Sequence, residues 1–164
     1  MNLVIRQATA TDASRIASFN VALARETEQR TLNRRVVGVG VRTLLAEPSH
    51  GFYIVADNGE KIVGMVMVTF EWSDWLNRQW WWLQSVYVDP AMRKRGVFTK
   101  IYNYIGEMGE RQGNVCGIRL YVEKENRHAQ RTYRSLGLNA NSYRLMEIPL
   151  KEKKAVKKSL RRKA

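Results

Sequence analysis

Residues 86–98 read Val86-Tyr87-Val88-Asp89-Pro90-Ala91-Met92-Arg93-Lys94-Arg95-Gly96-Val97-Phe98. The pattern predicts a strand that ends at Asp89-Pro90 and a helix that begins at about Gly96. Main-chain N–H groups at such a junction have no partners within the helix, and they lie at the positive end of the helix dipole. Three consecutive basic residues add cationic donors, and Gly96 lets a bulky anion approach the backbone. The junction therefore predicts a binding site for a diphosphate.

The residues before this junction predict two helices and four strands. A first strand is expected over Leu3 to Gln7, followed by a helix with its N-cap at Thr11-Asp12 and a second helix from about Val36 to Ala46. Strands are expected over 52–56, 62–70 and 80–88, and the turn Asp57-Asn58-Gly59 indicates that the first two of these form a hairpin. The three strands should form an antiparallel meander.

The residues after the junction predict alternating helices and strands. A helix is expected from about Gly96 to Arg111, a strand over 115–122, a helix over 126–136 and a last strand from Tyr143 to Leu150. A strand, a helix and a strand in succession require a parallel crossover, so the sheet should be mixed and the class α+β, or loosely α/β. We expect one domain over 1–150 and a basic tail over 151–164.

Residues 86–98 resemble the acetyl-coenzyme A binding motif of the GNAT acetyltransferase superfamily. That motif reads Gln or Arg, two residues, Gly, one residue, then Gly or Ala; Arg93 and Gly96 match it, and Phe98 replaces the second small residue. A downstream strand-to-helix motif of the family is similar at Val122, Asn126, Ala129, Tyr133 and Gly137. The resemblance covers about residues 2 to 149. It implies a mixed sheet with an antiparallel meander and a parallel crossover, flanked by about four helices.

The resemblance implies acetyl-coenzyme A (acetyl-CoA) as co-substrate. The residues expected to bind it are Val86, Tyr87, Val88, Arg93, Lys94, Arg95, Gly96, Val97, Phe98, Thr99, Asn126 and Tyr133. The main-chain amide of Val86 would polarise the thioester carbonyl, and the Tyr133 phenol would protonate the departing thiolate. Tyr133 could instead be a core residue of an amphipathic helix, and Asn126 could serve as a helix N-cap.

The general base is not settled by the resemblance. An amine with a pKa near 10 must lose a proton before it attacks. Some relatives place a Glu on the strand before the cofactor motif, but this chain has Gln84 there, which cannot accept a proton. Glu71 and Glu123 are the nearest substitutes, and a chain of water molecules is the alternative.

The resemblance also directs attention to carboxylates and aromatic rings near the first helices and the meander. The expected acceptor-binding residues are Glu26, Glu28, Trp72, Asp74, Trp75, Gln84 and Tyr87. Carboxylates would attract an ammonium group and aromatic faces would hold it by cation-π contact. Because alternate residues of a strand face opposite sides, at least one of Trp80, Trp81 and Trp82 should be core or interface. Residues 70–88 also look like the matching region of bacterial GNAT proteins related to diamine and polyamine acetyltransferases, without identifying one substrate.

Composition limits the remaining possibilities. With 164 residues, 45% hydrophobic, and no run of roughly 18 apolar residues or signal peptide, we expect a single-domain soluble cytoplasmic protein. One cysteine and two histidines offer no spaced ligand set, so no metal is expected. Residues 151–164 contribute +7 of the formal charge of +13. This tail could contact nucleic acid weakly, or it could be a solvated, frayed helix.

The leading hypothesis is therefore a small-molecule amine N-acetyltransferase that works by direct attack in a ternary complex. A protein or peptide N-acetyltransferase is the second hypothesis. A third is a nucleic-acid-associated module whose domain has lost activity. The last strand and the Trp-rich segment could also form a homodimer.

Overall fold

The computed structural model describes residues 2–150. The predicted basic tail, residues 151–164, lies outside the described residues. No helix within residues 2–150 combines the length and apolar character needed to cross a bilayer.

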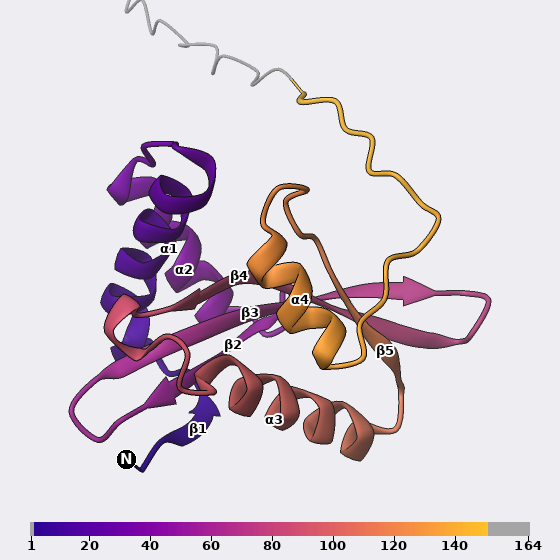
Figure 1. Ribbon diagram of the computed structural model, residues 1–164, viewed down its shortest axis with the longest axis horizontal. Helices are drawn as coiled ribbons and strands as arrows, with labels where there is room; N and C mark the ends of the chain where they lie inside the picture. The colour runs from indigo at the N-terminus through magenta and orange to yellow at the C-terminus, as the bar shows by residue number, and fades with distance from the viewer. Residues whose placement is uncertain (1, 151–164) are drawn as a thin grey trace, which may run out of the picture.

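The centre of the fold is a five-stranded mixed sheet (Figure 1). Its strands are β1 (Val4–Gln7), β2 (Phe52–Asp57), β3 (Ile62–Ser73), β4 (Arg78–Val88) and β5 (Val115–Leu120), in the spatial order β1-β2-β3-β4-β5. The first four strands pair antiparallel, and β4 pairs with β5 in parallel. This is the predicted combination of a meander and a parallel crossover.

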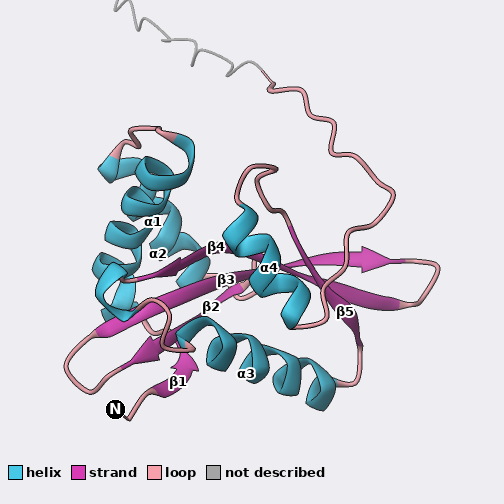
Figure 2. Cartoon of the chain, in the orientation of Figure 1, coloured by secondary structure: helices cyan, strands magenta, loops and turns pink. Residues whose placement is uncertain are grey.

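Four helices flank the sheet (Figure 2). The helices α1 (Ala13–Glu28) and α2 (Arg34–Ala46) pack on one face, where Ile16, Phe19 and Val41 are buried. The helix α3 (Val97–Gln112) packs on the other face through Val97, Ile101 and Ile105, and α4 (Arg127–Ser135) follows β5. Two 3-10 turns, η1 (Ala10–Asp12) and η2 (Pro90–Met92), precede α1 and α3. The predicted α+β class is confirmed.

Local sequence explains where two elements depart from the predicted boundaries. The Asn33 side chain accepts hydrogen bonds from the amides of Arg35 and Val36, so α2 begins at Arg34 rather than Val36. The β3–β4 hairpin extends to Ser73 and Arg78, and its added pairs include Trp72 opposite Gln79 and Ser73 opposite Arg78. Cross-strand side-chain pairs of this kind stabilise a hairpin beyond the main body of a sheet.

The predicted strand from Tyr143 to Leu150 is wrong for this single chain. These residues form no strand, and their large apolar side chains are exposed. The physical reason is that a strand needs a partner: β5 is the last strand of the sheet, and no described segment pairs with its outer edge. The predicted fifth strand itself ends at Leu120 rather than Val122.

Candidate active site

A β-bulge interrupts β4 at the start of the motif formed by residues 86–98. Met67 lies opposite Gln84 and Met65 lies opposite Tyr87, so β4 contains one more residue than β3 in this interval. Ser85 adopts the left-handed conformation, with φ of 48°. Bulges re-aim the chain locally and are frequent next to active sites. Val86 lies within this bulge.

The sheet opens at the same level. The last parallel pair between β4 and β5 joins Leu83 to Leu120, and no pair follows it. The residues of β4 from Gln84 onward therefore separate from the chain that follows β5. Val86 lies at the edge of this opening.

The loop after β4 presents a row of free main-chain N–H groups. Lys94 and Gly96 both have positive φ, 60° and 72°. The first amide of α3 with a helical acceptor is that of Lys100, which donates to the Gly96 carbonyl over 3.0 Å. Within residues 2–150, the N–H groups of residues 94–99 have no main-chain or side-chain acceptor in the loop or helix. Such a cradle at a helix N-terminus fits a diphosphate.

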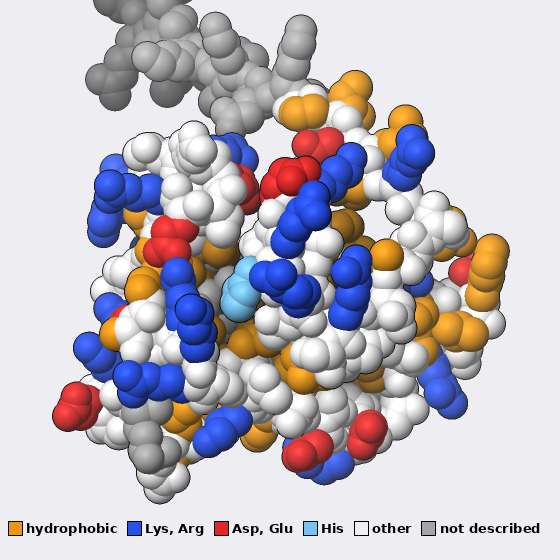
Figure 3. All heavy atoms as spheres, in the orientation of Figure 1, with side chains coloured by type: hydrophobic (Ala, Val, Ile, Leu, Met, Phe, Trp, Pro, Cys, Tyr) orange, Lys and Arg blue, Asp and Glu red, His pale blue; other side chains and the backbone are white. Residues whose placement is uncertain are grey.

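Two further features of the loop suit an anion. A Cβ atom placed on Gly96 would meet no other atom within 4 Å, so the space beside this residue is open. Lys and Arg side chains gather over the neighbouring helix α4 (Figure 3), whose sequence includes Arg127, Arg131 and Arg134. The local field therefore favours a polyanionic ligand.

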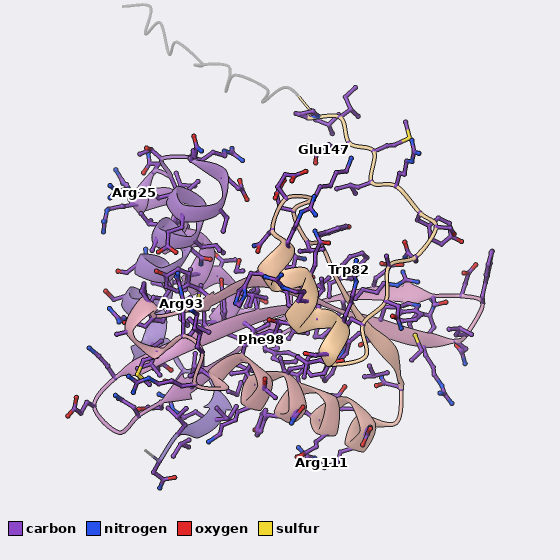
Figure 4. All side chains as sticks on the ribbon, viewed as in Figure 1. Arg25, Trp82, Arg93, Phe98, Arg111 and Glu147 are labelled. Atoms are coloured by element: carbon purple, nitrogen blue, oxygen red, sulfur yellow. The ribbon has the colours of Figure 1, made fainter. Side chains whose placement is uncertain are left out.

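Arg93, Tyr87 and Glu26 form a hydrogen-bonded cluster between the loop and α1. Arg93 Nη2 lies 2.6 Å from Glu26 Oε2, and the Tyr87 hydroxyl donates to Glu26 Oε1 over 2.7 Å. Arg93 Nε also donates to the Val88 carbonyl over 3.0 Å, and its guanidinium lies 5.4 Å from the centre of the Tyr87 ring. Figure 4 shows Arg93 on the side of the loop that faces α1. The structure thus brings together Arg93, which was predicted to bind the cofactor, Glu26, which was predicted to bind the acceptor, and Tyr87, which was predicted for both.

The charge state of this cluster follows from its contacts. Burial and the hydrogen bond to Glu26 raise the pKa of Tyr87 to about 12. Partial burial alone would raise the pKa of Glu26, but the hydrogen bonds from Tyr87 and Arg93 lower it below its ordinary value. Glu26 is therefore a carboxylate at neutral pH, and Tyr87 is a neutral phenol.

A second anchor ties the loop to α1. Arg15 Nη2 lies 2.9 Å from Asp89 Oδ2, and Asp89 Oδ1 accepts from the Ala91 amide over 3.1 Å. Asp89 thus caps the η2 turn while it is held by α1. Helix α1 positions both ends of the loop, through Asp89 and through Arg93.

Tyr133 on α4 faces the N-terminal end of α3. Its ring meets the Phe98 ring edge-on, with 5.5 Å between centroids, and Phe98 also lies 6.1 Å from Tyr102. The Phe98 side chain therefore packs toward α4. Within the described residues the Tyr133 hydroxyl has no hydrogen-bond partner, and burial raises its pKa above the ordinary value.

Asn126 is occupied as a helix cap. Its side-chain oxygen accepts from the Ala129 amide over 3.0 Å at the start of α4. This is the N-cap role that the sequence left open.

The predicted bases Glu71 and Glu123 are both engaged. Glu71 Oε1 lies 2.7 Å from Arg119 Nη1, and its other oxygen accepts from the Trp82 indole. Glu123 accepts from the Glu125 amide over 2.7 Å in the loop between β5 and α4. Both carboxylates therefore already have hydrogen-bond partners within the described residues.

The tryptophan run divides between the two faces of the sheet. Trp81 is fully buried against Phe52, on the α3 side. Trp80 and Trp82 face the other side, where the Arg119 guanidinium lies 3.9 Å and 5.8 Å from their ring centres. An aromatic cage therefore exists, and its cation is the protein's own arginine.

The remaining predicted acceptor residues are spread along the molecule. Gln84 donates to the Thr69 hydroxyl over 2.6 Å, on the face that carries Tyr87. Glu28 pairs with Arg30 at an exposed helix end. Trp72 lies opposite Gln79, seven residues from Val86, which is roughly 23 Å along the strand. Trp72, Asp74 and Trp75 thus lie at the hairpin end, away from the opening.

Three contributors to this site were missed by sequence reasoning: Ser85, Arg15 and Arg119. The sequence carries no signal for the Ser85 bulge, because serine is not typical of the left-handed region. Alternation along 115–120 could have placed Arg119 beside Trp80 and Trp82. Arg15 lies 74 residues from Asp89, and no local pattern links them.

Comparisons with known proteins agree with this fold. A model described as the Acetyltransferase (GNAT) family matches residues 8–138. A crystal structure described as a possible acetyltransferase from Clostridium difficile 630 is 41% identical, with a TM-score of 0.86, over 93% of this chain and 100% of that one. A search of curated protein sequences finds no significant match.

Two more distant structures share the fold. A transcriptional regulator from Bacillus halodurans C-125 is 23% identical, with a TM-score of 0.77, over 91% of this chain and all of that one. AAC(6')-Iy in complex with a bisubstrate analogue, CoA-S-monomethyl-acetylneamine, is 16% identical, with a TM-score of 0.74, over 92% of this chain and 99% of that one.

Proposed function

This chain belongs to the GNAT acetyltransferase family, and from that premise we propose that it transfers the acetyl group of acetyl-CoA to a primary amine of a small molecule. The observation that carries the proposal is the row of free N–H groups over residues 94–99, next to the opening of the sheet at Val86. The first feature suits a diphosphate, and the second gives a narrow acyl chain a path between two strands.

The chain's own groups can be assigned roles around that path. Acetyl-CoA supplies the activated thioester. The Val86 N–H, in the bulge, would donate to the oxygen on which charge develops, and one such donor is worth about 3 to 4 kcal/mol of barrier height. Tyr133 would donate its proton to the thiolate, and the raised pKa keeps the phenol protonated at neutral pH.

Glu26 is our candidate for the acceptor side. Its carboxylate lies beside Tyr87, directly after the bulge, and it is ionised at neutral pH. A carboxylate of lowered pKa binds an ammonium group well but removes its proton poorly. Glu71 and Glu123 are engaged elsewhere, so we assign Glu26 to amine binding and proton removal to a chain of water molecules.

Two measurements test this proposal in sequence. Calorimetry with acetyl-CoA should give binding in the micromolar range or tighter for protein freed of carried-over ligand. An acetyl-transfer screen, read by thiol release, should then compare polyamines, aminoglycosides, amino acids and basic peptides. Absence of acetyl-CoA binding at millimolar concentration would remove the donor. Binding together with transfer only to peptides would overturn the small-molecule assignment alone.

A further inference from the structure

The sheet face that carries Tyr87 continues beyond the helices that cover it. Met65 lies opposite Tyr87, and both are buried beneath α1, where the Phe19 ring is 5.0 Å from the Tyr87 ring. Four residues further along β3, Thr69 lies opposite Trp82, and both of these are partly exposed. Figure 1 shows that α1 and α2 lie at one end of β3 and β4. The half of the face around Trp82 is therefore accessible to a ligand.

Arg119 of β5 lies on this accessible half, against two aromatic rings. Its guanidinium carbon is 3.9 Å from the centre of the Trp80 ring and 5.8 Å from that of Trp82. The Trp80 indole in turn lies over Gly117, where a Cβ atom would collide with the ring. Glycine at this position of β5 leaves the room that the indole needs. The aromatic support of Arg119 is thus built by two neighbouring strands.

Most of the hydrogen-bonding capacity of Arg119 is unused. A guanidinium has five N–H donors in a planar fork. Within residues 2–150, its one hydrogen bond runs from Nη1 to Glu71 Oε1 over 2.7 Å, and the side chain is 29% exposed. Glu71 is itself fixed, because its other oxygen accepts from the Trp82 indole. A fork held in this way suits a carboxylate or a phosphate, which can accept two parallel hydrogen bonds.

Arg119 shares a cavity with the candidate general acid. The cavity has a volume of about 1280 Å³, and Arg119, Trp82, Tyr121 and Tyr133 are among the residues in its walls. The Tyr121 ring stacks on the Trp82 ring with 4.4 Å between centroids, which extends the aromatic wall. A molecule that occupies this cavity can therefore contact both Arg119 and the residues around the opening of the sheet.

Opposite charges lie at the two ends of this face. At one end Glu26, our candidate for binding the ammonium group, accepts from the Tyr87 hydroxyl. At the other end Arg119 lies opposite Trp82. The β3 partners of Tyr87 and Trp82 are four residues apart, which is about 13 Å along the strand. An acceptor with an ammonium group at one end and an anionic group at the other matches both charges.

We propose that the acceptor is an amine that also carries a carboxylate or phosphate group, and that Arg119 binds this group. The inference rests on the proposed function and narrows the class of its acceptor. A polyamine fits poorly, because the aromatic faces that would hold a second ammonium group already hold the Arg119 guanidinium. Residues 1–150 carry the remaining +6 of the formal charge, which also favours an anionic group. Arg119 is thus a specificity-determining residue.

The first test compares linear primary amines of matched length. Their far ends carry a methyl, an amino, a carboxylate or a phosphonate group, and the last two distinguish the possible anions. Acetyl transfer, read by thiol release, should give the lowest KM for the anionic series, at a length of about 13 Å. An equal or lower KM for alkylamines or diamines would overturn this inference and leave the proposed function intact. Absence of transfer to every amine would overturn both.

The second test removes the fork. Arg119→Gln should raise KM for the anionic amine about ten- to a hundredfold, whereas KM for the alkylamine of the same length and the affinity for acetyl-CoA should not change. Arg119→Lys keeps the charge without the fork, so its KM should be intermediate. Arg78→Gln is the control, because Arg78 is exposed at the start of β4 and carries the same charge. If Arg119→Gln raises KM equally for both amines while circular dichroism shows a folded protein, the proposal fails.

The third test has the opposite sign. Glu71→Gln removes the ion pair with Arg119, so KM for the anionic amine should fall and KM for diamines should stay the same. Glu107→Gln is the matched control, because it removes a carboxylate from the α3 side of the same cavity. A higher KM for diamines in Glu71→Gln would mean that Glu71 binds a cationic acceptor. That result, or an equal fall in KM for the two variants, would overturn the assignment of Arg119.

Discussion

Arg93, in the loop after β4, and Glu26 of α1 form an ion pair with 2.6 Å between Nη2 and Oε2. The pair joins the proposed diphosphate cradle to the proposed acceptor carboxylate. A ligand that draws Arg93 away removes one partner of Glu26. Likewise, a ligand that binds Glu26 changes the contacts of Arg93. The two halves of the site are therefore coupled through one contact.

Glu26→Gln should change acetyl-CoA binding and amine acetylation in opposite directions. Without the carboxylate, Arg93 is free to meet a diphosphate, so the dissociation constant for acetyl-CoA should fall a few-fold in calorimetry. The value of kcat/KM for the amine should fall about tenfold, because the acceptor loses its counter-charge.

Glu28→Gln is the control for this change. Glu28 lies half a turn along α1 and pairs only with Arg30, over 3.3 Å at an exposed position. Exposed pairs of this kind contribute little. Equal effects of the two substitutions on amine turnover would exclude a specific role for Glu26.

Tyr133→Phe tests the general acid. Loss of the hydroxyl should lower kcat by about ten- to a thousandfold, while acetyl-CoA affinity stays nearly unchanged because the ring contact with Phe98 is kept. Tyr102→Phe is the matched control, since Tyr102 also lies beside Phe98. Single-turnover kinetics give the chemical step directly, and a rate equal to that of the wild type would remove Tyr133 from the mechanism.

The sequence predicted the fold correctly wherever a local pattern of residues determines the local structure. Val97, Ile101 and Ile105 recur at helical spacing and are buried in α3, as is Gly109. The turn at Asp57-Asn58-Gly59 does join β2 to β3, with Asp57 and Asn58 accepting from the main chain of the turn. The strand expected from Tyr143 did not form because alternation predicts a strand-like segment but does not determine whether that segment pairs with the outer edge of β5.

The candidate site was predictable only in part, because a motif places residues that are close in sequence but not contacts between distant residues. Arg93 and Gly96 are neighbours in sequence and could be placed from the motif. The contact between Arg93 and Glu26 joins residues 67 positions apart, so it depends on how α1 packs against β4. Trp72 and Trp75 have suitable chemistry for an amine, but the length of the hairpin separates them from the opening.

Asp12 should make stability sensitive to acid. Asp12 is buried, and two hydrogen bonds from Arg6, of 2.8 Å and 3.0 Å, lower its pKa below the ordinary value. A group whose pKa is lowered on folding stabilises the protein above its unfolded pKa, near 3.9, and this contribution is lost as the pH falls through the folded value. Stability should therefore decrease below about pH 4.

Urea unfolding at pH 7 and pH 3 measures this contribution. Asp12→Asn should reduce the free energy of unfolding by about 2 kcal/mol at pH 7 and by less at pH 3, because at pH 3 the carboxyl group is mostly protonated in the unfolded chain, whose pKa is near 3.9, and part of the contribution is lost. Asp74→Asn, on the exposed hairpin, should leave both values unchanged. A deficit for Asp12→Asn that is independent of pH would show that the ion pair with Arg6 is not the cause.

Substitutions at the two ends of α3 distinguish a loss of diphosphate binding from an effect of backbone strain. Gly96 and Gly113 both have φ of 72°, and a Cβ atom at either position would meet nothing within 4 Å. Gly96→Glu and Gly113→Glu should therefore destabilise the fold similarly, by roughly 1 to 2 kcal/mol, since both force a side chain into the left-handed region. Only Gly96→Glu places a carboxylate among the free amides of residues 94–99. Calorimetry should show that it abolishes acetyl-CoA binding while Gly113→Glu retains it. If both variants stay folded and bind equally, the diphosphate does not lie at the start of α3.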